Sequence, residues 1–133
     1  MRKLLIAVLL VVCAGCLNEK VVGSSTATGV YNLRTINDTQ LPYKLPASGG
    51  SQIEVLDATI TLFQGNTYAE TSHVRVTTNG QTTTETREDA GAYSFFGITV
   101  TLTSGRGKPE RRGRIEETTM TLIDPGLSFV YRK

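Results

Sequence analysis

A single histidine is the first residue to consider for metal binding or proton transfer. His73 lies in the segment 72–76 (SHVRV), and neither His-x-His nor His-x-x-His spacing occurs in the sequence. A metal site needs several ligands at defined spacing. Side chains alternate along a strand, so a core position for Val74 and Val76 puts His73 on the solvent side. We expect a surface histidine, no metal site and no cofactor.

Three carboxylates, Glu85, Glu88 and Asp89, are the candidates for acid–base catalysis, because paired carboxylates perform such chemistry in glycoside hydrolysis. They lie beside Arg87 in a polar segment in which nothing desolvates them. The sequence contains no Gly-rich phosphate loop, no Gly-x-Ser-x-Gly motif and no zinc-ligand spacing. We therefore predict a solvated hairpin end there, and a protein that is not an enzyme.

A local run of basic residues is the candidate for contact with an anionic surface. The run lies in a segment rich in Gly and charge, is offset only by Glu110, and consists of Arg106, Lys108, Arg111, Arg112 and Arg114. As a loop it could contact lipid headgroups, lipopolysaccharide or an acidic partner. A charge run that only solvates a loop is the favoured interpretation.

The amino terminus has the three parts of an export signal. Basic Arg2 and Lys3 precede an apolar run over 4–12, and small residues follow up to Gly15. The run is shorter than the roughly 20 apolar residues that a membrane-spanning helix requires. We predict a signal-peptide helix within residues 1–15, although a buried N-terminal helix or strand is the other interpretation.

The end of this signal resembles the lipobox of bacterial lipoproteins. Ala14 and Gly15 stand at its small positions and Cys16 at the modified one, whereas Cys13 stands where the family usually has Leu. The resemblance implies cleavage between Gly15 and Cys16 and a lipid on the Cys16 thiol. Leu17 in place of Asp implies the periplasmic face of the outer membrane in a bacterium with two membranes. Cleavage by the ordinary signal peptidase, which gives a free soluble protein, is the alternative.

Processing changes the chemistry of the chain. Removal of residues 1–15 leaves 118 of the 133, and the loss of Arg2 and Lys3 removes the whole formal charge of +2. A neutral protein lacks the basic surface that nucleic-acid binding requires. Cys16 becomes the only cysteine, so the mature domain is expected to have no disulfide. Residues 16–28 indicate a flexible tether with a reach of roughly 20 Å, because their second half, 23–28 (GSSTAT), is small and polar.

Residues 29–133 predict one all-β domain, because Thr, Val, Ile, Tyr and Phe are frequent and turn residues recur at short intervals. The expected strands are 29–36, 52–56, 58–63, 67–78, 81–87, 91–95, 98–102, 113–115, 119–123 and 127–131. Asn79-Gly80 is a strong hairpin signal, and 81–87 is polar on both faces, as in an edge or rim strand. No segment shows helical periodicity over three turns. Together these features favour a small antiparallel up-and-down barrel of about eight strands.

Three short phrases resemble the small bacterial lipocalin-like domains of the calycin group. They are Gly29-Val30-Tyr31, the segment 60–68 (ITLFQGNTY) and Gly91-Ala92-Tyr93. The chain has no Trp and is shorter than secreted lipocalins, so side chains could fill the barrel. The resemblance implies a barrel that permits ligand binding, and aromatic residues on the strands would then line it, namely Tyr31, Tyr68, Tyr93 and Phe95.

We therefore expect a monomeric, non-enzymatic envelope lipoprotein that is held on the membrane by its lipid and binds a small apolar or amphipathic ligand. The alternative is a protein-interaction or inhibitor module that contacts an envelope protein through the basic loop 106–114. A ligand-sized cavity in the barrel distinguishes the two.

Overall fold

The computed structural model describes residues 26–133, and all of its regular elements are β-strands. Among the described residues there is no helix long and apolar enough to cross a membrane. The predicted signal peptide, its cleavage site at Gly15 and Cys16, and most of the predicted tether lie outside the described residues. The strands are β1 Gly29–Ile36, β2 Thr39–Gln40, β3 Tyr43–Lys44, β4 Ser51–Leu62, β5 Thr67–Thr78, β6 Gln81–Phe96, β7 Thr99–Ser104, β8 Arg111–Glu116, β9 Thr119–Asp124 and β10 Leu127–Arg132.

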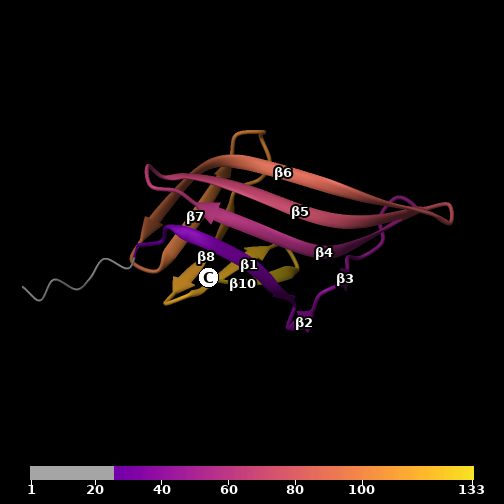
Figure 1. Ribbon diagram of the computed structural model, residues 1–133, viewed down its shortest axis with the longest axis horizontal. Coiled ribbons are helices and arrows are strands. Elements are labelled where there is room, and N and C mark those ends of the chain that lie inside the picture. The colour runs from indigo at the N-terminus through magenta and orange to yellow at the C-terminus, as the bar shows by residue number, and fades with distance from the viewer. Residues whose placement is uncertain (1–25) are drawn as a thin grey trace, which may run out of the picture.

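Eight of these strands form one closed antiparallel barrel (Figure 1). The order is β1-β10-β9-β8-β7-β6-β5-β4, and β1 closes it by pairing with β4 from Gly29↔Leu62 to Asn32↔Thr59. The short strands β2 and β3 pair with β1 and β4 outside this ring. The predicted all-β, up-and-down barrel of about eight strands is confirmed.

Two-residue turns connect several of the strands, as the sequence indicates. At the predicted hairpin, Asn79 and Gly80 have φ values of 51° and 77°, the positive values that a type I′ turn requires. Asn37 and Asp38 have φ values of 49° and 61° and connect β1 to β2 in the same way. Asn, Asp and Gly tolerate this backbone region at low cost, which explains why the chain reverses at these positions.

The structure merges strands that the sequence analysis predicts as separate. β6 is one strand of 16 residues that includes both 81–87 and 91–95, because its pairing with β5 continues unbroken from Gln81 to Ala92. β4 likewise combines 52–56 and 58–63, and a register shift between Val55 and Asp57 absorbs the extra residue. β8 begins at Arg111, so the second half of the basic run lies on a strand instead of a loop.

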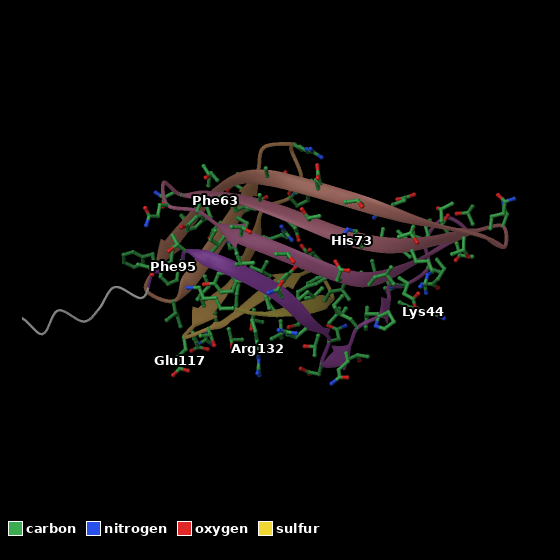
Figure 2. All side chains as sticks on the ribbon, viewed as in Figure 1. Lys44, Phe63, His73, Phe95, Glu117 and Arg132 are labelled. Atoms are coloured by element: carbon green, nitrogen blue, oxygen red, sulfur yellow. The ribbon has the colours of Figure 1, made fainter. Side chains whose placement is uncertain are left out.

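One end of the barrel is closed and apolar. The turns at 63–66, 97–98 and 117–118 gather there, and Figure 2 shows Phe63, Phe95 and Glu117 at this end. The buried Tyr31 hydroxyl donates to the Ala27 carbonyl at 2.7 Å, so Ala27, which the sequence analysis assigns to the tether, packs against the barrel. The largest fully buried side chains of the interior are Tyr31, Tyr131, Ile36, Ile60, Leu62, Leu102, Met120, Leu122 and Val100.

The opposite end, which we call the mouth, carries the turns at 37–38 and 125–126 and the loop 105–110. Beyond it, β4, β5 and β6 continue as a three-stranded extension (Figure 1). Two inward-facing glycines allow neighbouring strands to approach closely near the middle of the barrel. A Cβ at Gly113 would lie 1.9 Å from the Thr121 carbonyl oxygen, and one at Gly91 would lie 2.1 Å from that of Thr103.

Candidate ligand site at the barrel mouth

The barrel interior changes from apolar to charged between its closed end and its mouth. On β8, Ile115 is followed toward the mouth by Gly113 and then by Arg111. The inward positions of β9 likewise run from Met120 through Leu122 to Asp124. Because side chains on one face recur every second residue, these positions form layers across the barrel. The charged layer therefore lies just inside the mouth.

An ion pair crosses the interior in this layer. The Arg111 guanidinium donates to both carboxylate oxygens of Glu70, at 3.1 and 2.6 Å, and the Tyr131 hydroxyl donates to Glu70 Oε1 at 3.4 Å. The side chains of Glu70 and Arg111 are only 14% and 18% exposed. Burial alone would lower the pKa of Arg111, but the hydrogen bonds and charge of Glu70 reverse this effect and raise the pKa above its usual value. The pair engages both terminal nitrogens of the Arg111 guanidinium.

A second polar cluster surrounds Asp89, which is 4% exposed. Its carboxylate accepts hydrogen bonds from the Tyr68 hydroxyl at 2.9 Å and the Ser104 hydroxyl at 2.7 Å, and Lys108 Nζ lies at 3.7 Å. Burial alone would raise the pKa of Asp89, but the two hydrogen bonds and the Lys108 charge outweigh it, so the pKa is lower than usual. Asp89 is thus a buried, ionised and fully partnered carboxylate.

A hollow of about 150 Å³ lies in the barrel next to the Glu70–Arg111 pair. One wall is apolar and includes Leu33, Leu45 and Phe129. Its lining also contains two residues with hydrogen-bond donors, Ser72 and Arg87. Its full lining is Leu33, Leu45, Val55, Ala58, Glu70, Ser72, Val74, Arg87, Arg111, Phe129 and Tyr131.

Arg87 is the cation of this hollow that is least engaged by other groups. Its side chain is 47% exposed, and its contact with Glu85 is a single hydrogen bond of 3.3 Å between neighbours on one strand face. A larger hollow of about 380 Å³ is lined by Asp124, Lys108 and Pro109 together with the charged layer. Both hollows are lined by Glu70 and Arg111.

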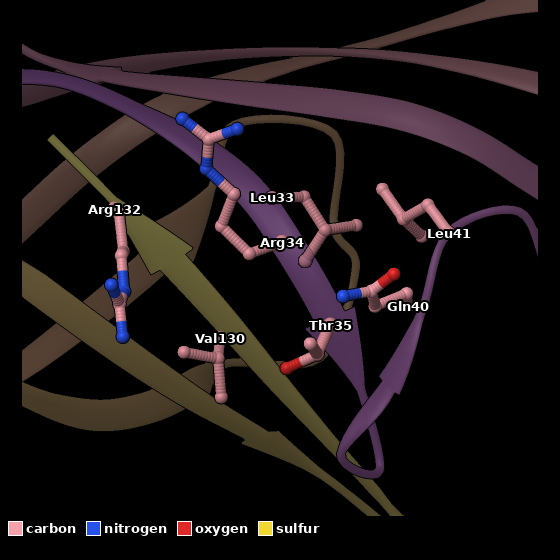
Figure 3. Close-up of a pocket in the computed structure, with 7 residues that line it drawn as sticks. All are labelled: Leu33, Arg34, Thr35, Gln40, Leu41, Val130 and Arg132. Atoms are coloured by element: carbon pink, nitrogen blue, oxygen red, sulfur yellow. The ribbon is translucent and has the colours of Figure 1, made fainter.

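The largest of these hollows, about 620 Å³, lies on the outer wall of β1 and β10 (Figure 3). Arg34 and Arg132 flank it, and neither forms an ion pair within residues 26–133. In Figure 3 their guanidinium groups point in opposite directions, so they do not converge on one anion. The hollow at the mouth combines converging polar and apolar groups and is therefore the better ligand site.

The four aromatic residues predicted to line a ligand cavity lie deeper in the barrel. Tyr31 and Tyr93 are buried at the closed end, where the Tyr93 hydroxyl donates to the Phe63 carbonyl at 2.9 Å. Tyr68 is buried and holds Asp89, and Phe95 packs against the core while half-buried. Other residues line the hollows described above. A lining role for the four aromatics stays a prediction.

The structure disperses the basic run instead of gathering it. Arg106 donates to the Glu88 carbonyl, Lys108 faces Asp89, and Arg111 turns into the barrel. On the outer face, Arg112 pairs with Glu110 and Arg114 with Glu116, both at 2.8 Å. Each of the five basic side chains thus has an acceptor of its own. Contact with headgroups or a partner through this run remains a prediction.

The remaining candidates lie partly as expected. His73 is half-exposed and bonds Asp57 at 2.6 Å, as a surface histidine would. Glu85 and Glu88 are exposed, but the expectation that nothing desolvates the cluster is wrong for Asp89. The continuous β6 carries Asp89 into the barrel, where the sequence suggests a turn.

Sequence reasoning missed Glu70 and Ser72, and it assigned Arg111 to a contact loop instead of the barrel interior. One signal was available, since Tyr68, Glu70 and Ser72 share a face with Val74 on a predicted strand. Within residues 26–133, no group of three or more His, Cys, Asp or Glu side chains is placed to hold a metal ion. No protein-family model matches the chain, and no curated protein sequence matches it either.

Proposed function

We propose that this protein is a membrane-anchored envelope lipoprotein, not an enzyme, whose barrel binds the polar end of a small amphipathic ligand at its mouth. The observation that carries the proposal is the 150 Å³ hollow, whose lining combines an apolar wall with Ser72 and Arg87. Binding sites of this kind are mostly apolar, with a few converging polar groups that fix orientation.

The chemistry of the lining favours an anionic ligand head. Both terminal nitrogens of Arg111 donate to Glu70, whereas Arg87 is half-exposed and weakly paired, so Arg87 is the cation that an incoming carboxylate would meet. The Ser72 hydroxyl can donate a second hydrogen bond to the same group. The aliphatic or aromatic part of the ligand would then lie against Leu33, Leu45 and Phe129.

The volume limits what enters. A cavity of 150 Å³ holds a molecule of about benzene size, whereas sites that enclose a drug-sized ligand begin at about 300 Å³. The hollow therefore accepts one end of the ligand, and the rest extends through the mouth past the loop 105–110. Two features support membrane anchoring: the lipobox resemblance at Cys16, and the entry of the described chain at the closed end, which leaves the mouth free.

Octanoate is a suitable probe, with octanol and octylammonium as matched head-group controls. We expect octanoate to bind the full chain, as measured by calorimetry, and Arg87→Gln to weaken that binding by about tenfold, since a hydrogen bond to a charged group contributes roughly 1.5–3 kcal/mol. Arg112→Gln, on the outer wall, serves as the control variant and should bind like the wild type. Absence of octanoate binding, or equal binding by Arg87→Gln, would contradict the proposal.

A further inference from the structure

One edge of the three-stranded extension, on β6, has no neighbouring strand among the described residues. β7 pairs only with Gly91–Phe96 of β6, so the preceding residues 81–90 pair with β5 on one side and with no strand on the other. The opposite edge, on β4, is covered by the chain itself. There β3 pairs with Glu54 and Val55, and the Leu45 amide donates to the Ile53 carbonyl. The chain covers one edge of the extension and leaves the other open (Figure 1).

Two hydrogen bonds show which residues of β6 point their backbone N–H and C=O groups toward the open edge. The Ala90 carbonyl accepts from the Gly105 amide, and the Glu88 carbonyl accepts from Arg106 Nη1, so even-numbered residues of β6 face away from β5. Successive residues of an antiparallel strand face alternate neighbours. Thr82, Thr84 and Thr86 therefore present N–H and C=O groups that have no partner in the described part of the chain. Such a row is a template for another strand.

We propose that two copies of this protein associate through this edge, antiparallel and in register, with Thr84 of one copy opposite Thr84 of the other. This register places Thr82 opposite Thr86 on each side of the centre. It uses the three residues whose backbone groups are unpaired, and it leaves the Glu88 carbonyl with Arg106. Cross-strand Thr–Thr pairs are also favourable.

Neighbouring registers are worse for two different physical reasons. A shift that centres the pairing on Glu85 sets two Glu85 carboxylates directly opposite each other, which is destabilising. A shift that centres it on Thr86 sets Gly80 and Asn79 of the second copy opposite Ala92 and Tyr93, which already pair with β7. In the register centred on Thr84, Glu85 meets Thr83 and Arg87 meets Gln81, so each charge faces a hydrogen-bonding side chain.

A second copy fits this edge for reasons of length and composition. The free segment ends at the hairpin on one side and at the loop 105–110 on the other, so the incoming strand must be short and its turn must fall before that loop. The matching segment of a second copy meets both conditions. It has no Pro and no Lys, residues that commonly protect exposed edges. The proposed dimer departs from the monomer that the sequence analysis expects, because closure of the barrel does not cover the edge of this extension.

Disulfide trapping tests the register. In the full chain with Cys13→Ser and Cys16→Ser, Thr84→Cys should form a disulfide-linked dimer under mild oxidation, because directly opposite residues that exchange hydrogen bonds have Cα atoms about 5.5 Å apart. Thr86→Cys is the matched control and should stay monomeric, since its counterpart lies four residues away along the strand. Equal trapping of both variants, or trapping of neither, would overturn the proposal.

Sedimentation of the uncrosslinked full chain tests the backbone contribution. Thr84→Pro removes the central N–H, which faces away from β5, and should weaken self-association by at least about tenfold at unchanged melting temperature. Thr84→Val keeps the N–H and should associate like the wild type. If Thr84→Pro is destabilised, the trapping experiment decides alone. A wild-type chain that remains monomeric at the highest soluble concentration would refute the dimer.

Discussion

Glu70 and Arg111 meet across the barrel interior although their strands, β5 and β8, are separated in the sheet by β6 and β7. Their two hydrogen bonds connect opposite walls just inside the mouth. The pair closes the floor of the proposed ligand hollow and keeps Arg111 from the solvent. Because the charges are buried together, each depends on the other.

Replacing one member of this pair should therefore lower the free energy of unfolding far more than replacing both members with apolar residues. Glu70→Leu or Arg111→Met alone leaves one largely buried charge without its partner, and we expect each to lower the free energy of unfolding by about 3–5 kcal/mol. The double variant Glu70→Leu/Arg111→Met should recover most of that loss. Urea titration of the four proteins measures the coupling. Additive losses would show that the charges act independently, and the exposed pair Arg114–Glu116 provides a control with an effect below about 1 kcal/mol.

Asp89 should make the free energy of unfolding depend on pH in the acid range. Its folded pKa lies below the usual 3.8, so the stabilisation from its ionised form is complete above about pH 4 and is lost as the pH falls through the folded value. Asp89→Asn should be less stable at neutral pH and should have a flatter stability profile below about pH 4. Unfolding free energies across this range check the prediction. Asp57→Asn, in the exposed pair with His73, should follow the wild type.

Gly113 should not tolerate a side chain. Its Cβ would overlap the Thr121 carbonyl and approach Leu122 atoms at 2.9 Å, and a paired backbone cannot withdraw without breaking the β8–β9 ladder. We expect Gly113→Ala to destabilise the fold by about 3 kcal/mol, at the upper end of the range for overpacking. Thermal melting compares it with Arg112→Ala on the outer wall, for which little change is expected. A melting temperature equal to that of the control would mean that the strands can separate.

The proposed anchor makes a separate prediction. Cys16→Ser should move the protein from the membrane fraction to the soluble fraction and remove the mass of the lipid, whereas Cys13→Ser should stay in the membrane fraction. Cell fractionation followed by mass spectrometry of the purified protein measures both properties. Membrane retention of the Cys16→Ser variant would contradict lipidation at that residue.

Most of the barrel could be predicted from local sequence signals. Alternation of Thr with apolar residues in 58–62, and turn pairs such as Asn79-Gly80, depend on neighbouring residues only, and both indicate the strands that the structure contains. The continuity of β6 through Asp89 could not be predicted in this way. A charged residue before Ala90-Gly91 is typical of a turn. Only the folded structure shows that Tyr68 and Ser104, which are distant in the sequence, donate hydrogen bonds to Asp89 inside the barrel.

The candidate site depended even more on distant contacts. Glu70 and Arg111 are 41 residues apart, and although strand alternation places Glu70 on the face of Val74, nothing local pairs it with Arg111. The tyrosines that the sequence favours as lining residues are large enough to fill the closed end themselves. The hollow therefore forms where smaller or charged side chains, such as Ser72 and Arg87, occupy the inward positions.

The barrel closes through pairing of β1 with both β4 and β10. Every other junction of the ring joins strands that follow one another along the chain, so most of the sheet can assemble progressively during synthesis or export. Completion of the ring has to wait for β10. Until then the growing sheet has two further open edges, on β1 and on its newest strand, and such a species is prone to intermolecular pairing. We expect closure to be the slow step of folding, and the interval before it to be when this chain most needs a chaperone.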